Sequence, residues 1–429
     1  MFEPLLSRLS GIRTANRIGR VVEVGPATLR VAGLSDIAAQ GDRVSLRSGK
    51  GEVLVLSADG LTVLPDGPTD GVAIGDPVAL VGSATIAPGD HWIGRIVDPD
   101  GLPLDGRPLL AAGQPRPLRV APPRAAVRRR LGGRLATGAA VFDTLLPLVS
   151  GQRIGLFAGS GVGKSTLLGA LARNVRADVT VLALVGERGR EVRAFAEDVL
   201  GAKGLARSVI VAATSDQSPL LRRRCAMSAM AAAEHFRDQG AQVLFLCDSV
   251  TRFAEAHREV SAAGGEGATL RGWPPSLAHA IMSLAERAGP GEPGMGDITA
   301  VFSVLVAGSD MDEPVADILR GVLDGHVVLD RRVAERGRFP AIDLLRSVSR
   351  SLPSCANDEE NALIAEARQM LSAWDKAELM VQSGLYAAGS DPVTDRAIRL
   401  FPKLDAFLAE PSPDGSDGAF ARLAQILSG

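Results

Sequence analysis

The stretch GSGVGKST places three glycines, a lysine and three hydroxyl residues directly after an apolar run and before a helix-forming one. Glycine adopts backbone conformations that other residues avoid, so successive N–H groups can turn inward onto phosphate oxygens. A lysine here can reach the terminal phosphates, and the serine hydroxyl can bind a magnesium ion that bridges them. The spacing therefore predicts a loop that binds the phosphates of a nucleotide, formed by Gly159, Ser160, Gly161, Val162, Gly163, Lys164, Ser165 and Thr166.

Carboxylates follow two apolar runs that have the composition of buried strands. Asp248 ends VLFLC, and Glu187 and Arg188 follow VTVLALVG. Ligands of open α/β sheets lie at the carboxyl ends of the strands. We therefore expect Asp248 to hold magnesium through a water, Glu187 to polarise an attacking water, and Arg188 to bind phosphate oxygens. Taken alone, the GERGRE motif is also compatible with a solvated turn.

The composition is that of a soluble globular enzyme, with 46% apolar and 22% charged residues among 429. A formal net charge of −2 gives no global reason to expect nucleic acid or an acidic membrane as partner. No uncharged apolar run approaches the length of a membrane span. The three cysteines and five histidines lack metal-type spacing, which argues against zinc and against a disulfide framework and favours a reducing cytoplasm.

Patterning divides the N-terminal third into three expected segments. Residues 1–17 would form a helix with an apolar face. Residues 18–90 contain short strand-like runs between Gly, Pro and Asp turns, which predicts a small β-barrel. This barrel contains no aromatic residue to stack on bases, so binding of single-stranded nucleic acid is disfavoured. Residues 91–134, rich in proline and arginine, favour a solvated connector over a surface for an anionic partner.

From residue 135 apolar strand-like runs alternate with helical ones, which predicts an α/β domain over 135–351 with a largely parallel sheet covered on both faces. From residue 352 the strands stop, and apolar residues recur at helical spacing, so 352–429 should be a helical domain. The expected strands are 153–158, 179–186, 209–214, 243–247, 298–308 and 326–330, and the expected helices are 165–175, 189–201, 218–238, 249–261 and 275–287.

Further motifs occur in the same order and at similar spacing as in the flagellum-specific protein export ATPases, and over most of residues 18–410 the chain resembles that family. The family is close to the ATPase of type III secretion injectisomes and resembles the catalytic subunit of F-type ATP synthases. The resemblance implies a P-loop NTPase (RecA-like) core. The motifs are FAGSGVGKST, GERGRE, ATSDQSPLLRRR, LFLCDSVTRFAEAHRE, LRGWPPS, DMDEPVAD, LDGHVVLDR and RFPAIDLLRSVSR, with GRIVDPDGLPLDG upstream.

The resemblance also implies roles for single residues. Glu187 matches the glutamate that activates water, Asp248 the second-motif aspartate, and Lys164 and Ser165 the phosphate and magnesium ligands. The remaining matches are Arg188 and Arg252, near the γ-phosphate, and Gln217, a polar residue near the nucleotide.

One aromatic and one basic residue bear on binding of the adenine base and on assembly of the protein. Phe339 matches an aromatic residue placed against adenine; core packing is the alternative. Arg350 matches an arginine finger that enters the neighbouring subunit's site, with a surface salt bridge as the alternative. A finger supplied in trans would make activity depend on a ring, which in this family is a homohexamer.

The resemblance thus implies Mg²⁺-dependent ATP hydrolysis that energises protein export through a flagellar apparatus, in the cytoplasm and peripheral at the inner membrane. Implied partners are a regulatory stator-like subunit bound through the N-terminus, export substrates, chaperones and the export gate, without nucleic acid. An injectisome ATPase is the main alternative. A rotary synthase subunit is disfavoured because 384–395 lacks an acidic helix–turn segment, and a non-catalytic subunit because Glu187 is present. Departures from the family are Trp273 for a tyrosine and a short N-terminal segment.

Overall fold

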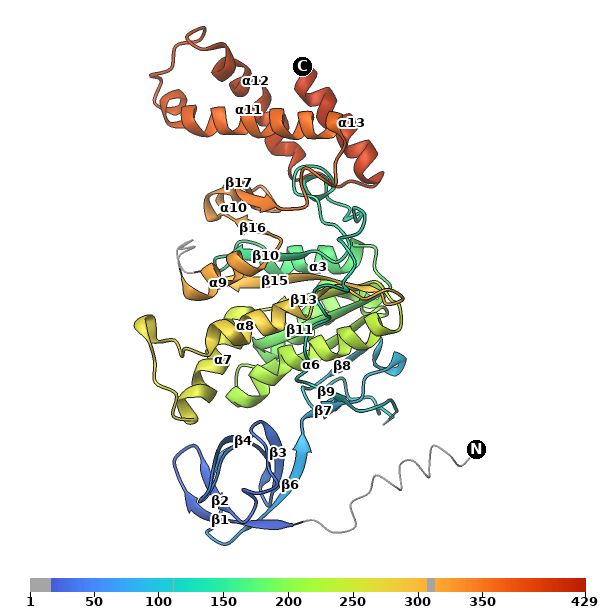
Figure 1. Cartoon of the computed structure of the whole chain (residues 1–429). Coiled ribbons are helices and arrows are strands. Elements are labelled where there is room, and N and C mark those ends of the chain that lie inside the picture. The colour runs from blue at the N-terminus through green and yellow to red at the C-terminus, as the bar shows by residue number, and fades with distance from the viewer. Residues whose placement is uncertain (1–16, 111, 307–312) are drawn as a thin grey trace.

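The computed structural model describes residues 17–110, 112–306 and 313–429, so the helix expected over 1–17 lies outside the described residues except for its last position. A β-barrel, a central sheet with helices on both faces, and a group of helices follow one another along the chain. The barrel and the C-terminal helices lie at opposite ends of the molecule (Figure 1). The expected fold class is confirmed.

The barrel is closed by six strands in the order β1-β2-β5-β4-β3-β6. Its interior is filled by aliphatic side chains such as Val21, Val31, Val53 and Val63, which are almost completely buried. Side chains that alternate inward along each strand fill a barrel of this size. The strands are β1 (Ile18–Val24), β2 (Leu29–Ala32), β3 (Asp42–Leu46), β4 (Gly49–Ser57), β5 (Gly60–Pro65) and β6 (Pro77–Ser83).

The central sheet has the order β17-β16-β10-β15-β13-β11-β12-β8, with the short β14 paired to β15. Its pairs are parallel except β16 with β17 and β14 with β15. Each expected strand is present, and the edge strands β8 and β17 were missed. The strands are β8 (Arg95–Val97), β10 (Arg153–Ala158), β11 (Val179–Glu187), β12 (Ser208–Thr214), β13 (Val243–Asp248), β14 (Gly289–Pro290), β15 (Asp297–Leu305), β16 (Gly325–Leu329) and β17 (Ile342–Ser349).

Alternate residues of the central strands pack into two separate apolar clusters. On β11, Leu182 and Leu184 join the cluster that contains α3, whereas Val181 and Ala183 join the one that contains α6. Burial on both faces explains the nearly continuous apolar runs in the sequence. The helices are α2 (Ala140–Asp143), α3 (Lys164–Asn174), α4 (Gly189–Ala194), the π-helical η2 (Phe195–Leu200), α5 (Gly201–Leu205), α6 (Pro219–Asp238), α7 (Val250–Ala263), α8 (Leu277–Glu286), α9 (Pro314–Val322) and α10 (Arg331–Glu335).

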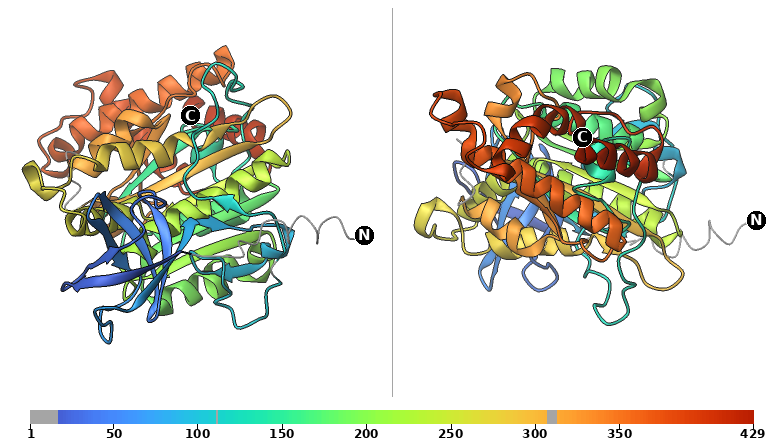
Figure 2. Two further views of the ribbon diagram at one scale, coloured as in Figure 1. Left: turned by 60° about the horizontal axis from the view of Figure 1, so that its bottom comes forward. Right: turned by 90° about the horizontal axis from the view of Figure 1, so that it is seen from above.

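The C-terminal helices α11 (Asp358–Gln382), α12 (Pro392–Phe407) and α13 (Gly415–Ser428) continue the cluster on the α3 side. Seen from this end, they lie across the central sheet (Figure 2). A capping box formed by Asn357 and Glu360 starts α11. Within the described ranges, no helix combines the length and the apolar character needed to cross a bilayer.

The segment 91–134, for which the sequence predicts a solvated connector, is mostly exposed over 106–110 and 112–133 but is anchored to the rest of the protein at several points. Its strand β8 pairs with β12 at the sheet edge. Arg116 pairs with Asp238, and Arg134 donates to Glu360 at 2.9 Å and is only 13% exposed. Arg116 and Arg134, whose charges suggested contact with solvent, are instead paired with carboxylates far away in sequence.

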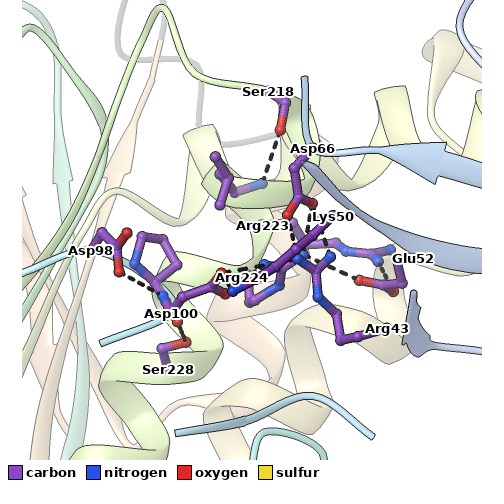
Figure 3. Close-up of polar contacts among 12 residues, drawn as sticks. Arg43, Lys50, Glu52, Asp66, Asp98, Asp100, Ser218, Arg223, Arg224 and Ser228 are labelled. Carbon is purple, nitrogen blue, oxygen red and sulfur yellow. Dashed lines mark hydrogen bonds and ion pairs between the residues drawn. The ribbon is translucent and has the colours of Figure 1, made fainter. Parts of the chain in front are cut away.

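An ionic network joins the barrel to α6 (Figure 3). Arg224 is nearly buried and donates to Asp66 after β5 at 3.1 Å and to Asp100 at 2.8 Å. Its neighbour Arg223 donates to Glu52 of β4 at 2.7 Å. Since a buried charge is tolerated only when it is paired, this network fixes the barrel against the helix that follows β12.

Candidate nucleotide-binding and active site

The glycine-rich loop connects β10, which ends at Ala158, to α3, which begins at Lys164. Gly161 and Gly163 have φ values of 77° and 87°, in the left-handed region that favours glycine. Gly163 is the N-cap, and its missing side chain leaves the first N–H groups of α3 without a side-chain cap. These N–H groups and the positive helix end are suited to bind an anion.

A cavity of about 530 Å³ opens over this loop at the carboxyl ends of β10, β11 and β12. The sheet order brings these strand ends together, as expected for an open α/β sheet. Ten of the residues expected from the sequence line it: Gly159, Ser160, Gly161, Gly163, Lys164, Ser165, Thr166, Glu187, Arg188 and Arg252. Gly186, Glu191, Ser215 and Leu305 complete the lining.

Lys164 and Asp248 form an ion pair beside the loop. Asp248 is 4% exposed, and its Oδ1 atom also accepts a hydrogen bond of 2.8 Å from the Ser303 hydroxyl. Ser303 lies on β15, between the strand of the phosphate loop and the strand of Asp248. The sequence analysis missed Ser303, although a hydroxyl within the apolar run of β15 was a signal.

Glu187 is the last residue of β11 and is partly buried. The pKa of its carboxyl is raised to about 7, chiefly by burial and also by the nearby Asp248 and Glu191, while Lys164 acts in the opposite direction. A carboxylate that titrates near neutral pH can take up a proton from water effectively. The raised pKa would suit Glu187 to accept a proton from a water molecule in this cavity.

Arg188 follows the end of β11, Arg252 lies in the first turn of α7, and both line the cavity. Arg188 is 67% exposed and 3.4 Å from Glu191, and Arg252 is 44% exposed and 2.9 Å from Glu255. Exposed pairs between neighbouring helical residues are worth little. Both guanidinium groups can therefore exchange these partners for phosphate oxygens.

Five expected residues, all within the described ranges, are not part of the cavity lining: Val162, Gln217, Asp248, Phe339 and Arg350. Val162 is buried in the core next to α3. The Gln217 side chain turns back and accepts a hydrogen bond of 3.2 Å from the backbone of Thr214. Phe339 is 52% exposed, and its Cδ1 atom is 3.2 Å from the position that a Cβ atom on Gly163 would take. Phe339 therefore lies against the phosphate loop, which rules out simple core packing.

Arg350 directly follows β17 and lies near the amino-terminal end of β10, whereas the phosphate loop lies at the carboxyl end of that strand. Its backbone N–H donates to Asp324 O, and Asp324 also binds the backbone of Arg153, the first residue of β10. The phosphate loop follows the last residue of that strand, about 16 Å away at roughly 3.3 Å per residue. Arg350 is thus not part of the cavity of its own chain, where it donates instead to Arg320 O at 3.2 Å.

The oxygen atoms near the loop suit magnesium bound together with phosphate. Mg²⁺ uses one or two protein ligands, several waters and substrate phosphates. The Ser165 hydroxyl and the Asp248 carboxylate supply this donor type. In the part of the chain that the structure describes, no group of three or more His, Cys, Asp or Glu residues could hold a metal. The site therefore fits an ion that arrives with the nucleotide.

Comparisons with known proteins match both the central and the C-terminal parts. Residues 138–349 match the model of the ATP synthase alpha/beta family, nucleotide-binding domain, and residues 356–419 match the T3SS EscN ATPase C-terminal domain. The chain is similar to a flagellum-specific ATP synthase of Caulobacter vibrioides, with 43% identity over 99% of this chain and 98% of the relative. It is also similar to a type 3 secretion system ATPase of Xanthomonas euvesicatoria, with 40% identity over 100% and 97% of the two chains.

Solved structures that are similar to this chain come from the same group of ATPases. The assembled ATPase EscN of enteropathogenic E. coli superposes with a TM-score of 0.89 at 35% identity, covering 95% of this chain and all of EscN. EscN in complex with its central stalk EscO gives a TM-score of 0.87 at 35% identity over the same shares of both chains. The fold and these identities make the chain a P-loop ATPase, and it belongs to the family of flagellum-specific ATP synthases and type III secretion ATPases.

Proposed function

We propose that the chain hydrolyses Mg²⁺-bound ATP as a homohexameric ring and thereby energises protein export through a flagellar type III secretion apparatus. The observation that carries the hydrolytic part is the position of Glu187 in the same cavity as Lys164 and the phosphate loop. This combination provides a base, a cation and an anion-binding helix end in one place.

In this proposal the loop N–H groups and Lys164 bind the β- and γ-phosphates. Mg²⁺, held by Ser165 and through water by Asp248, would neutralise charge on the phosphates. Glu187 orients a water molecule and accepts its proton, which leaves a nucleophile directed at the terminal phosphorus. Arg188 and Arg252 leave their exposed carboxylate partners and bind the oxygens on which charge develops.

The ring is proposed because a further cation for the cavity, the guanidinium of Arg350, would come from a neighbouring protomer. Arg350 lies near the first residue of β10, away from the cavity of its own chain, so in the proposed ring the Arg350 side chain of a neighbouring protomer would supply a further cation to this cavity. The solved relative EscN is described as assembled, which agrees with activity in an oligomer.

We further propose that the ring works in the cytoplasm, peripheral at the inner membrane export apparatus. Its partners would be a regulatory stator-like subunit that binds the N-terminus, export substrates with their chaperones, and the export gate, without nucleic acid. The lack of aromatic residues in the barrel supports the last point. EscN forms a complex with a central stalk, which supports a protein partner for the ring.

An injectisome ATPase is the second candidate, since the Xanthomonas relative covers the whole chain at 40% identity. Deletion of the gene, with complementation by the wild-type chain or by Glu187→Gln, tests the proposal. We expect loss of swimming and of secreted flagellar proteins, restored by the wild-type chain alone. Normal motility together with loss of effector secretion would instead establish the injectisome function.

A further inference from the structure

The segment between α10 and β17 carries Phe339 and lies between the sheet and the C-terminal helices (Figure 1). Phe339 is 52% exposed, and the edge of its ring lies beside Gly163 of the phosphate loop, close enough to contact a Cβ atom at that position. Burial therefore does little to fix the ring, and its position depends on the backbone of this segment.

The neighbouring Arg338 is the residue that fixes this backbone. Its side chain is 9% exposed and donates to Pro340 O at 3.2 Å and to Ile342 O at 2.7 Å. The same guanidinium forms an ion pair of 2.9 Å with Asp405 near the end of α12. A planar guanidinium holds several acceptors in a fixed arrangement. One side chain thus joins both sides of Phe339 to the C-terminal helices.

We propose that Arg338 and Asp405 are positioning residues that hold Phe339 against the phosphate loop and so set the affinity of the site for the base end of the nucleotide. The inference rests on the proposed nucleotide-binding function and on a contact of Phe339 with the base, which the resemblance implies and the position of Phe339 beside Gly163 supports. Loss of the Asp405 charge would leave a buried guanidinium without its counter-charge, which is strongly unfavourable. Arg338 would then turn toward water, and the segment that carries Phe339 would lose its fixed geometry.

A second ion pair between the same two parts of the chain provides a matched control. Arg336 contacts Glu378 of α11 at 3.1 Å, with side chains 48% and 25% exposed. This pair also ties the segment to the C-terminal helices, but its guanidinium lies in solvent, where such pairs contribute little. Glu378→Gln removes one carboxylate charge, as Asp405→Asn does, without touching the guanidinium beside Phe339.

The test compares ADP with inorganic pyrophosphate, because both bind the phosphate loop and ADP alone carries a base. Affinities are measured by calorimetry on the full chain for wild type, Asp405→Asn, Glu378→Gln and Phe339→Ala. Base–aromatic contacts of this kind predict a loss of roughly tenfold in ADP affinity for Asp405→Asn and Phe339→Ala. Pyrophosphate affinity should be the same in wild type and all three variants. Glu378→Gln should also match wild type in ADP affinity.

Each alternative outcome has a distinct meaning. Equal losses of ADP and pyrophosphate affinity in Asp405→Asn would show a general structural defect and overturn the inference. Loss of ADP affinity in Phe339→Ala but not in Asp405→Asn would overturn the positioning role while retaining the contact with the base. Unchanged ADP affinity in Phe339→Ala would refute that contact itself. If Asp405→Asn does not fold, Arg338→Lys keeps the charge but lacks the planar guanidinium that spans the two carbonyls and Asp405, and it should show the same selective loss.

Discussion

Ser303 donates a hydrogen bond of 2.8 Å to Asp248 from the strand that separates Asp248 from the phosphate loop. The accepting oxygen, Oδ1, is also the atom that Lys164 contacts. Two donors on one oxygen fix the plane of the carboxylate. The orientation of the group proposed to hold magnesium is therefore set by a buried hydroxyl outside the cavity.

Removing the Ser303 hydroxyl should lower the apparent affinity of the site for Mg²⁺. A hydrogen bond to a charged group contributes about 1.5–3 kcal/mol, so Ser303→Ala should raise the Mg²⁺ concentration for half-maximal hydrolysis by roughly tenfold. Ser303→Thr keeps the hydroxyl and should behave as wild type. ADP binding measured with and without Mg²⁺ gives a second readout. Equal ADP binding by Ser303→Ala and wild type at every Mg²⁺ concentration would contradict the role of Ser303.

Replacing Glu187 by glutamine should separate binding from turnover. The amide keeps the shape of the side chain but cannot accept a proton from water, so kcat should fall by about 10²–10⁴ while ATP affinity is retained. Glu191→Gln alters another carboxylate of the same cavity and should keep turnover within about tenfold of wild type. Retained turnover in Glu187→Gln would remove the base role from this residue.

The raised pKa of Glu187 also predicts a pH effect on the stability of the nucleotide-free protein. The folded chain releases this proton at about pH 7, whereas the ordinary value is 4.5. Between these values the folded state binds more protons than the unfolded state, so this group lowers stability as pH rises. Glu187→Gln should therefore melt at a higher temperature than wild type at pH 8, and the difference should shrink toward pH 5. A constant difference across this range would show that Glu187 has an ordinary pKa.

The phosphate loop and the strand ends were predictable because each is encoded within a few consecutive residues. Lys164, Glu187 and Asp248 follow from glycine spacing and from polar residues placed directly after apolar runs. The partners of Arg224 were not predictable in this way, since Asp66 is 158 residues distant in sequence and the two meet only when the barrel packs on α6. Strand β17 was missed for a different reason: at the sheet edge it buries Ser347 and Ser349 and exposes Leu345 and Val348, so its sequence lacks the continuous apolar run of the parallel strands.

Arg350 gives the sharpest prediction about assembly. Arg350 lies away from the cavity of its own chain and would act on the terminal phosphate in the neighbouring protomer. Arg350→Ala should therefore lower hydrolysis by about 10³ or more without changing ATP affinity. Lys164→Ala should be inactive for lack of phosphate binding. In a mixture of the two variants, some cavities combine an intact Lys164 with an intact Arg350 from the neighbour, so hydrolysis should reappear. Wild-type activity per chain should rise with protein concentration as rings form, and each variant alone serves as the control. If the mixture is no more active than the sum of its parts, Arg350 does not act across a subunit boundary.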